Sequence, residues 1–185
     1  MAQKLLIQAK ANEPSITQDL KTIAKLTNAK VVGLENKLKS EKSLTRKLGD
    51  LTEKLNIPID KIAKFNNDAL RYTFVFKTEN YGAGFAETIV RLKKKGYEVS
   101  KMWNAWRNQG REEDSGYRGL NVTLKSSQSQ KFELQFHTAE SFRLKTETHA
   151  LYEEFRNPKT SEARKVEISK YVVELAKKIN RPQGI

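Results

Sequence analysis

The segment FELQFH, residues 132–137, alternates strictly between apolar and polar side chains. A period of two residues is typical of a β-strand that buries one face and turns the other toward polar surroundings. The apolar residues are therefore predicted to face the core, and the polar ones to share the opposite face: Glu133, Gln135 and His137. Three polar side chains in line on a central strand indicate that this face meets something polar.

The segments around this strand predict a sheet enclosed by helices. Other segments rich in β-branched and aromatic residues are predicted strands: 30–34, 70–77, 97–106 and 119–125. Helices are predicted where apolar residues recur every three or four positions: after Pro14, over 43–55, over 81–95 and beyond residue 138. This order predicts the α+β class, with a mixed β-sheet of about five strands flanked by helices.

The length of 185 residues suits a single domain over 1–185. Residues 1–29 are predicted to be an N-terminal helical extension, and residues 159–185 a C-terminal helix. No apolar run approaches the roughly 18 residues needed to span a bilayer. We therefore expect a protein that works in an aqueous compartment and has no membrane partner.

The composition excludes several kinds of site and favours anionic partners. The chain has no cysteine, which rules out disulfides, a thiol nucleophile and cysteine-based zinc sites. Its 35 Lys and Arg residues outnumber 22 Asp and Glu residues, giving a net charge of +13. This excess favours nucleotides, RNA or an acidic binding protein, although a solvated basic surface explains it equally well. We expect no DNA binding, because neither a helix-turn-helix nor a zinc-finger pattern is present.

A basic segment at the start of the predicted helix 43–55 is a candidate phosphate site. Lys37 and Lys39 precede the helix, and Ser43 and Lys47 lie four residues apart on one of its faces. Ammonium groups and a hydroxyl at a helix N-terminus form a cradle for polyphosphate. The alternative interpretation is an exposed basic start of a helix.

Two carboxylates are candidates for a shared magnesium ion. Asp68 lies at the start of the predicted strand 70–77, and Glu133 lies on the polar face of the strand 131–137. If these strands are neighbours, the two carboxylates can bind one Mg²⁺ together. The alternative for Asp68 is a role as a cap or turn residue.

The segment SGYRG, residues 115–119, places an aromatic and a basic residue between glycines. Glycines allow the backbone to approach a ligand closely, and Tyr117 offers a flat face on which a base can stack. A simple hairpin loop is the alternative explanation.

In this order, the four segments resemble the synthetase domain of the RelA/SpoT family of pyrophosphokinases, which has a nucleotidyltransferase-like fold. The family's Arg-x-Lys-Ser-x-x-Ser-x-x-x-Lys pattern reads here as KLKSEKSLTRK, residues 37–47. Its aspartate at the start of a strand corresponds to Asp68, and its Gly-Tyr loop to Gly116-Tyr117. Its Glu-Ile-Gln-Ile-Arg-Thr strand corresponds to residues 133–138. The resemblance covers roughly residues 30 to 155.

The resemblance implies an enzyme that transfers the β,γ-pyrophosphate of ATP to a ribose 3′-hydroxyl and releases AMP. The residues implied to hold ATP are Lys37, Lys39, Ser43, Arg46 and Lys47. Asp68 and Glu133 are implied to be catalytic and to bind Mg²⁺, with Glu133 also taking the proton of the attacking hydroxyl. The residues implied to contact the acceptor are Tyr117, Gln135 and His137.

Departures from the family pattern leave the acceptor open. Lys37 stands in place of the first arginine, His137 in place of the arginine of the last strand, and Asn121 in place of a histidine. The acceptor is expected to be a purine nucleotide, either AMP, ADP or ATP, or GDP or GTP, giving ppApp- or ppGpp-type products. The alternatives are the 3′-CCA end of tRNA, or a non-catalytic module that binds RNA or a partner.

The segment from residue 132 to residue 156 resembles a divergent branch of the family found in secreted polymorphic toxins and phage-associated proteins. This resemblance implies an antibacterial toxin that acts in the bacterial cytoplasm, delivered there as part of a larger effector. It also implies a partner, an acidic immunity protein that neutralises the toxin.

Overall fold

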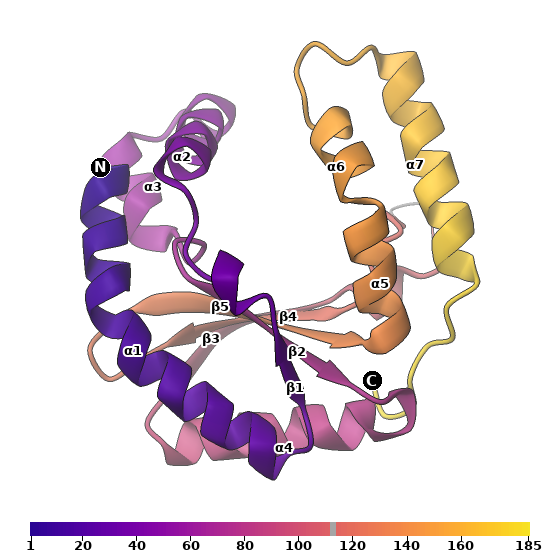
Figure 1. Cartoon of the computed structure of the whole chain (residues 1–185). Coiled ribbons are helices and arrows are strands. Elements are labelled where there is room, and N and C mark those ends of the chain that lie inside the picture. Colours follow the sequence, from indigo (N-terminus) through magenta and orange to yellow (C-terminus); the bar gives the residue numbers. More distant parts are fainter. Residues whose placement is uncertain (112–113) are drawn as a thin grey trace.

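The computed structural model describes residues 1–111 and 114–185, and a five-stranded sheet forms its centre (Figure 1). The strands, which lie in the order β1-β2-β5-β4-β3, are β1 (Lys30–Val32), β2 (Arg71–Phe76), β3 (Glu98–Asn104), β4 (Leu120–Lys125) and β5 (Lys131–Thr138). β2 and β5 are parallel, whereas the other neighbours are antiparallel. The predicted mixed sheet and α+β class are confirmed.

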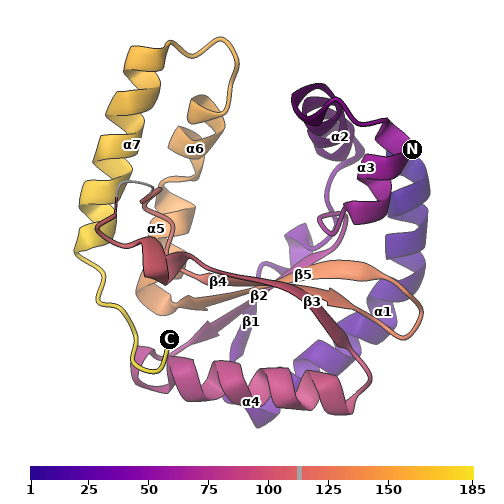
Figure 2. The same ribbon diagram turned by 180° about the vertical axis from the view of Figure 1, so that it is seen from behind.

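The helices lie on both sides of this sheet. They are α1 (Ala2–Leu26), α2 (Glu41–Leu55), α3 (Ile59–Phe65), α4 (Tyr81–Lys94), α5 (Ala139–Glu147), α6 (His149–Phe155) and α7 (Glu162–Lys177). α4 and the C-terminal half of α1 lie beneath the sheet, whereas α2 and the group α5 to α7 rise from its other side (Figures 1 and 2). In residues 1–111 and 114–185, none of the helices combines the length and the apolar composition required to span a bilayer.

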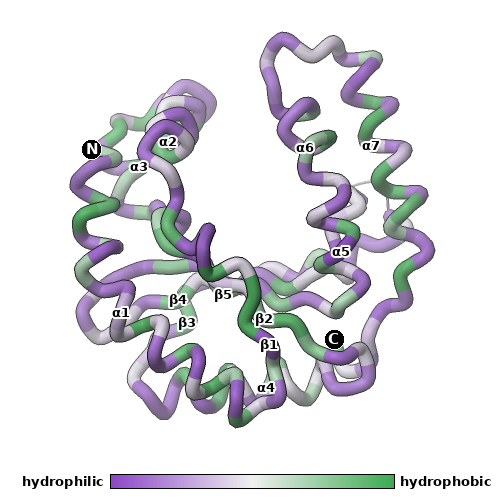
Figure 3. Tube along the Cα trace, viewed as in Figure 1, coloured by the Kyte–Doolittle hydropathy of each residue, from purple (hydrophilic) through white to green (hydrophobic). Residues whose placement is uncertain are grey.

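The face of the sheet toward α4 and α1 forms the core. The inward side chains of β2 and β5 are almost fully buried, and most are aromatic: Tyr72, Phe74, Phe76, Phe132, Leu134 and Phe136. The ring of Phe85 on α4 meets Phe136 edge to face, with centroids 4.9 Å apart. The tube in Figure 3 is accordingly hydrophobic along much of β1 and β2 and mostly hydrophilic on α6. The alternation predicted for β5 is therefore confirmed on its core side.

α1 continues through Pro14, although the sequence pattern indicates helical spacing only after that residue. Proline inside a helix costs about 3 kcal/mol or more because it removes one backbone hydrogen bond. Ala9, Ile16 and Leu20 are buried on either side of it, and this contact with the core offsets the cost. The predicted N-terminal helical extension is therefore a helix that covers the sheet.

The C-terminal part of the chain and one short helix differ from the expected pattern. α7 occupies only part of the predicted helix 159–185, and the residues after it return to the start of α4, where Gln183 lies against Gly82. α3, which follows Pro58, was not predicted. The charged sequence of residues 108–116 predicts a loop before β4, and its residues 112–113 lie outside the described residues.

A buried ion pair holds the segment that leads into β4. Arg118 donates from Nη1 to Asp114 Oδ1 at 2.7 Å and from Nη2 to Oδ2 at 2.9 Å, and both side chains are almost completely buried. The same carboxylate accepts the backbone N–H groups of Gly110 and Gly116. Gly116 has a φ of +74°, and a Cβ there would lie 2.7 Å from the Val172 side chain of α7. The ion pair and the glycine together fix residues 114–118 against α7.

Asp114→Asn is expected to lower the free energy of unfolding by about 3–5 kcal/mol, because it leaves the buried guanidinium of Arg118 without its counter-charge. Urea unfolding monitored by circular dichroism measures this loss. The matched control, Glu162→Gln, removes an exposed ion pair with Lys165 on α7 and should cost less than about 1 kcal/mol. Equal losses in the two variants would show that the buried pair does not hold the loop.

Candidate functional site

The face of the sheet opposite the core carries two rows of polar side chains. In the first row, Glu133 on β5 is the register partner of Arg71 on β2 and of Thr123 on β4. In the second row, Gln135 is the partner of Thr73 on β2 and Asn121 on β4. Register partners point to the same side of a sheet. Glu133 and Gln135 therefore lie on a polar face formed by three strands, whereas His137, whose partner on β2 is Val75, does not extend these rows.

Asp68 lies just before β2, where it is 6% exposed and surrounded by cations. Lys39 and Lys47 both donate to its Oδ2, Lys47 at 2.7 Å, and Arg71 Nη1 lies 3.9 Å from its Oδ1. Burial alone would raise the pKa of the Asp68 carboxyl, but Lys47 and Lys39 outweigh burial and hold this pKa below its ordinary value. Three cations around one carboxylate leave an excess of positive charge, which suits an anionic ligand.

Local backbone structure brings the two lysines to Asp68. The N–H of Lys39 donates to the carbonyl of Ala69 at 3.1 Å, so the segment before α2 runs beside the start of β2. Ser40 then caps α2, and its Oγ accepts the N–H of Ser43 at 3.3 Å. Burial lowers the pKa of the Lys39 ammonium, an effect that the nearby Asp68 partly offsets. The predicted phosphate cradle thus has a capped helix start next to two converging ammonium groups.

Two other residues predicted to hold ATP form ion pairs elsewhere. Lys37 Nζ lies 3.4 Å from Glu13 on α1, and Arg46 Nη2 lies 3.3 Å from Glu153 on α6. The pair of Arg46 links α2 to α6, two helices that stand opposite each other above the sheet (Figure 1). The structure therefore brings only part of the predicted set to Asp68.

Tyr117 stacks on Trp103, a residue that was not among the predicted site residues. The two rings are nearly parallel, at 8°, with centroids 5.5 Å apart. Asn121, the register partner of Trp103, accepts the Tyr117 hydroxyl through Oδ1 at 2.7 Å. Trp103 is 41% exposed, so this pair presents an aromatic surface at the end of the second polar row.

His137, which was predicted to contact the acceptor, is fully buried. Its Nε2 lies 3.0 Å from the Tyr117 hydroxyl, and its Nδ1 lies 3.0 Å from Ser141 Oγ. Burial, assisted by the charge of Lys145, lowers the pKa of His137 to about 3, so the ring is neutral at pH 7. A Cβ at Gly119 would lie 2.9 Å from His137 Cε1. His137 therefore supports Tyr117, and the glycine permits this close approach.

Lys145 on α5 also reaches the polar face, and it was not among the predicted site residues. Its Nζ donates to Gln135 Oε1 at 2.5 Å, and Gln135 Nε2 donates to Glu133 Oε1 at 2.6 Å. Burial, together with Arg71, lowers the pKa of Lys145 to about 8, and Glu133 partly offsets this effect. Gln135, predicted to contact the acceptor, is thus engaged on both sides by charged neighbours.

Asp68 and Glu133 fit a magnesium ion in the chemistry of their donor atoms, because Mg²⁺ prefers carboxylate oxygen. In the part of the chain that the structure describes, Glu133 Oε2 has no hydrogen-bond partner, and Asp68 Oδ1 has only the 3.9 Å contact with Arg71. No group of three or more His, Asp or Glu residues that could hold a metal occurs in the same ranges. Water or phosphate oxygens would have to complete the coordination.

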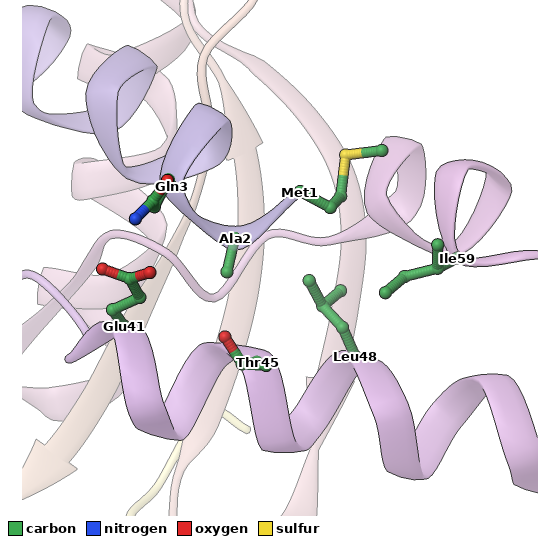
Figure 4. Close-up of a pocket in the computed structure, with 7 residues that line it drawn as sticks. All are labelled: Met1, Ala2, Gln3, Glu41, Thr45, Leu48 and Ile59. Atoms are coloured by element: carbon green, nitrogen blue, oxygen red, sulfur yellow. The ribbon is translucent and has the colours of Figure 1, made fainter.

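Two cavities lie beside α2. One, of about 250 Å³, is lined by residues 1–3, by Glu41, Thr45 and Leu48 on α2, and by Ile59 on α3 (Figure 4). It contains none of the predicted site residues. The other, of about 230 Å³, is bordered by Lys47 and is mostly apolar. Of the two lysines that bind Asp68, only Lys47 lines this second cavity.

No family model matches the sequence, and no curated protein matches it either. Solved structures do match. Small alarmone synthetases 1 and 2 from Bacillus subtilis each align with a TM-score of 0.64 at 15% identity, over 94% of this chain and 89% of theirs. The Type VI effector Tas1, solved with its immunity protein, aligns with a TM-score of 0.57 at 17% identity, over 96% of both chains.

At sequence identities this low, the structural alignments establish a shared fold but not a shared activity. The aligned proteins include synthetases and an effector, and each alignment covers nearly the whole of both chains. The chain has the fold of the small alarmone synthetases, as its resemblance to the RelA/SpoT synthetase domain predicts.

Proposed function

We propose that the chain is an ATP-dependent pyrophosphokinase that transfers the β,γ-pyrophosphate of ATP to the 3′-hydroxyl of a purine nucleotide. The observation that carries the proposal is that one of the three cations around Asp68, Arg71, also lies beside Glu133. Arg71, which contacts Asp68, is the register partner of Glu133 on the neighbouring strand. A site for polyphosphate and a carboxylate base thus share one polar face, in a chain with the fold of alarmone synthetases.

In the proposed reaction, the acceptor 3′-oxygen attacks the β-phosphorus of ATP, and the bond from this phosphorus to the oxygen shared with the α-phosphate breaks. AMP leaves with that oxygen, and Glu133 takes the proton of the attacking hydroxyl. Lys39 and Lys47 hold the phosphate oxygens of the donor. Asp68 and Glu133 would hold Mg²⁺, which would neutralise charge that develops on the transferred group.

The stacked pair of Trp103 and Tyr117 is the proposed platform for the acceptor base. Aromatic side chains stack on purines of either kind, so the platform suits adenine nucleotides as well as guanine nucleotides. The products would be of the ppApp or ppGpp type. The net charge of +13 also favours a larger polyanion, and the 3′-CCA end of tRNA is the second candidate acceptor.

We also propose that the activity serves as a toxin in the bacterial cytoplasm. The likeness to a Type VI effector supports delivery into a target cell as part of a larger effector. The same structure holds an immunity protein, and an acidic immunity protein is the partner that the positive charge of this chain would attract.

Glu133→Gln is expected to lower the rate of AMP release by about 10²- to 10⁴-fold, because the amide cannot take the proton. The assay uses purified protein, Mg²⁺ and γ-labelled ATP, separately with AMP, ADP, GDP, GTP and bulk tRNA. Glu147→Gln, an exposed exchange on α5, is the control and should keep the wild-type rate. Label on tRNA alone would make tRNA the acceptor, and a wild-type rate in Glu133→Gln would remove Glu133 as the base.

Lys39→Ala and Lys47→Ala are each expected to raise the KM for ATP by about tenfold or more, because each removes a charge-assisted hydrogen bond to phosphate. Steady-state kinetics at saturating acceptor measure this change. The control is Lys42→Ala, which removes an exposed ammonium from α2, the helix that carries Lys47. If all three variants raise the KM equally, the lysines contribute only general surface charge.

Acceptor nucleotides are expected to quench the fluorescence of Trp103, since a stacked base contacts its exposed ring directly. Titration of the wild type should show this quenching, whereas Trp103→Phe should keep only the constant emission of Trp106, which is fully buried. Quenching that persists in Trp103→Phe would place the acceptor base elsewhere.

A further inference from the structure

The start of α5 determines where Lys145 lies relative to β5. Thr138 ends the strand and caps the helix: its Oγ1 accepts the Ser141 N–H at 3.1 Å, and Ser141 Oγ accepts the Thr138 N–H at 3.0 Å. This reciprocal capping fixes the direction of the helix as it leaves the strand. Two turns into the helix, Lys145 reaches back to Gln135 on the same strand.

The charges on its two sides determine the orientation of the Gln135 amide. An ammonium only donates and therefore needs the amide oxygen, whereas a carboxylate only accepts and needs the amide NH₂. Lys145 Nζ lies 2.5 Å from Oε1, and Glu133 Oε1 lies 2.6 Å from Nε2. A reversed amide would make both contacts repulsive, so Lys145 and Glu133 together lock it in one orientation.

We propose that Lys145 is a positioning residue that holds the Glu133 carboxylate in place through the Gln135 side-chain amide. This inference rests on the proposed function, in which Glu133 takes the proton of the acceptor hydroxyl. The amide occupies Glu133 Oε1, and Oε2 has no hydrogen-bond partner among the described residues. The hydrogen-bonded series Lys145–Gln135–Glu133 therefore presents one oxygen of the Glu133 carboxylate in a fixed direction.

The surroundings of Lys145 argue against a role limited to stability. Its hydrogen bond goes to a neutral amide, Arg71 on β2 disfavours its charge, and Glu133 on β5 favours it. The ammonium also lowers the pKa of His137, which faces it from β5. A cation that loses hydration without a carboxylate partner costs folding free energy. Such a residue in the middle of a polar face is expected to act on the chemistry.

The test is a double-mutant cycle on the full chain with the acceptor that the wild type uses. Lys145→Met and Gln135→Leu are each expected to lower kcat by about 10- to 100-fold, because small misplacements of a reacting group cost this much. The KM values for ATP and acceptor should change little. The double variant should be no slower than the slower single variant, since both exchanges break the same chain of contacts. Lys145→Arg should recover part of the rate.

Arg143→Met is the matched control, because it removes an exposed cation from the same helix. It should keep the wild-type kcat. Losses that multiply in the double variant would overturn the proposal, since the two residues would then act independently. A higher KM for the acceptor at unchanged kcat in Lys145→Met would also overturn it, because Lys145 would then bind the acceptor itself.

A second measurement separates this inference from the proposed function. In ¹⁵N-labelled protein, the side-chain NH₂ resonances of Gln135 should shift in Lys145→Met and in Glu133→Gln, and stay in place in Arg143→Met. If these shifts occur but the wild type releases no AMP with any acceptor, the proposed function fails and the structural coupling stands. If the resonances do not move in Lys145→Met, the coupling itself is wrong.

Discussion

The position of β5 between β2 and β4 is the constraint on which the rest of the structure depends. Its pairing is parallel on one side and antiparallel on the other, so its side chains meet register partners from both neighbours. One face contributes Phe132, Leu134 and Phe136 to the core. The other face sets Glu133 beside Arg71 and Gln135 beside Asn121. Folding of the core and assembly of the site are thus achieved by the same set of backbone hydrogen bonds.

The polar face carries more positive than negative charge. Asp68 is shared by two ammonium groups and approached by a guanidinium, while Lys145 donates its hydrogen bond to a neutral amide and lies over the Phe142 ring. Positive charge therefore exceeds negative charge around the two carboxylates. In the low dielectric of a partly buried site, such an excess repels itself and is relieved when a polyanion binds. The proposed donor, which carries several phosphate charges, provides this relief.

Much of the fold and part of the site could be predicted because their signals are local. The alternation in β5 and the positions of the strands are visible in short windows of sequence, whereas the Ser40 cap, which starts α2 at Glu41 rather than at residue 43, was not predicted. Sequence reasoning missed Lys145, Trp103 and the ion pair of Asp114 with Arg118. The role of each depends on contacts that form only in the folded chain. Lys37 and His137 show the converse: motif positions pointed to ligands, but tertiary contacts with Glu13 and Ser141 engage both side chains.

The two faces of β5 also help to explain how low sequence identity can accompany structural alignments that cover nearly the whole chain. Successive residues of β5 have different roles: one packs in the hydrophobic core, and the next lies on the polar face of the candidate site. Position 137 carries histidine where the family pattern has arginine, and position 136 carries phenylalanine where the pattern has isoleucine, so residues on either face can be exchanged while the alternation is kept. The alternation of apolar and polar side chains, rather than any particular residue, is thus the requirement on β5, and it is compatible with identities of 15–17% to synthetases and an effector of the same fold.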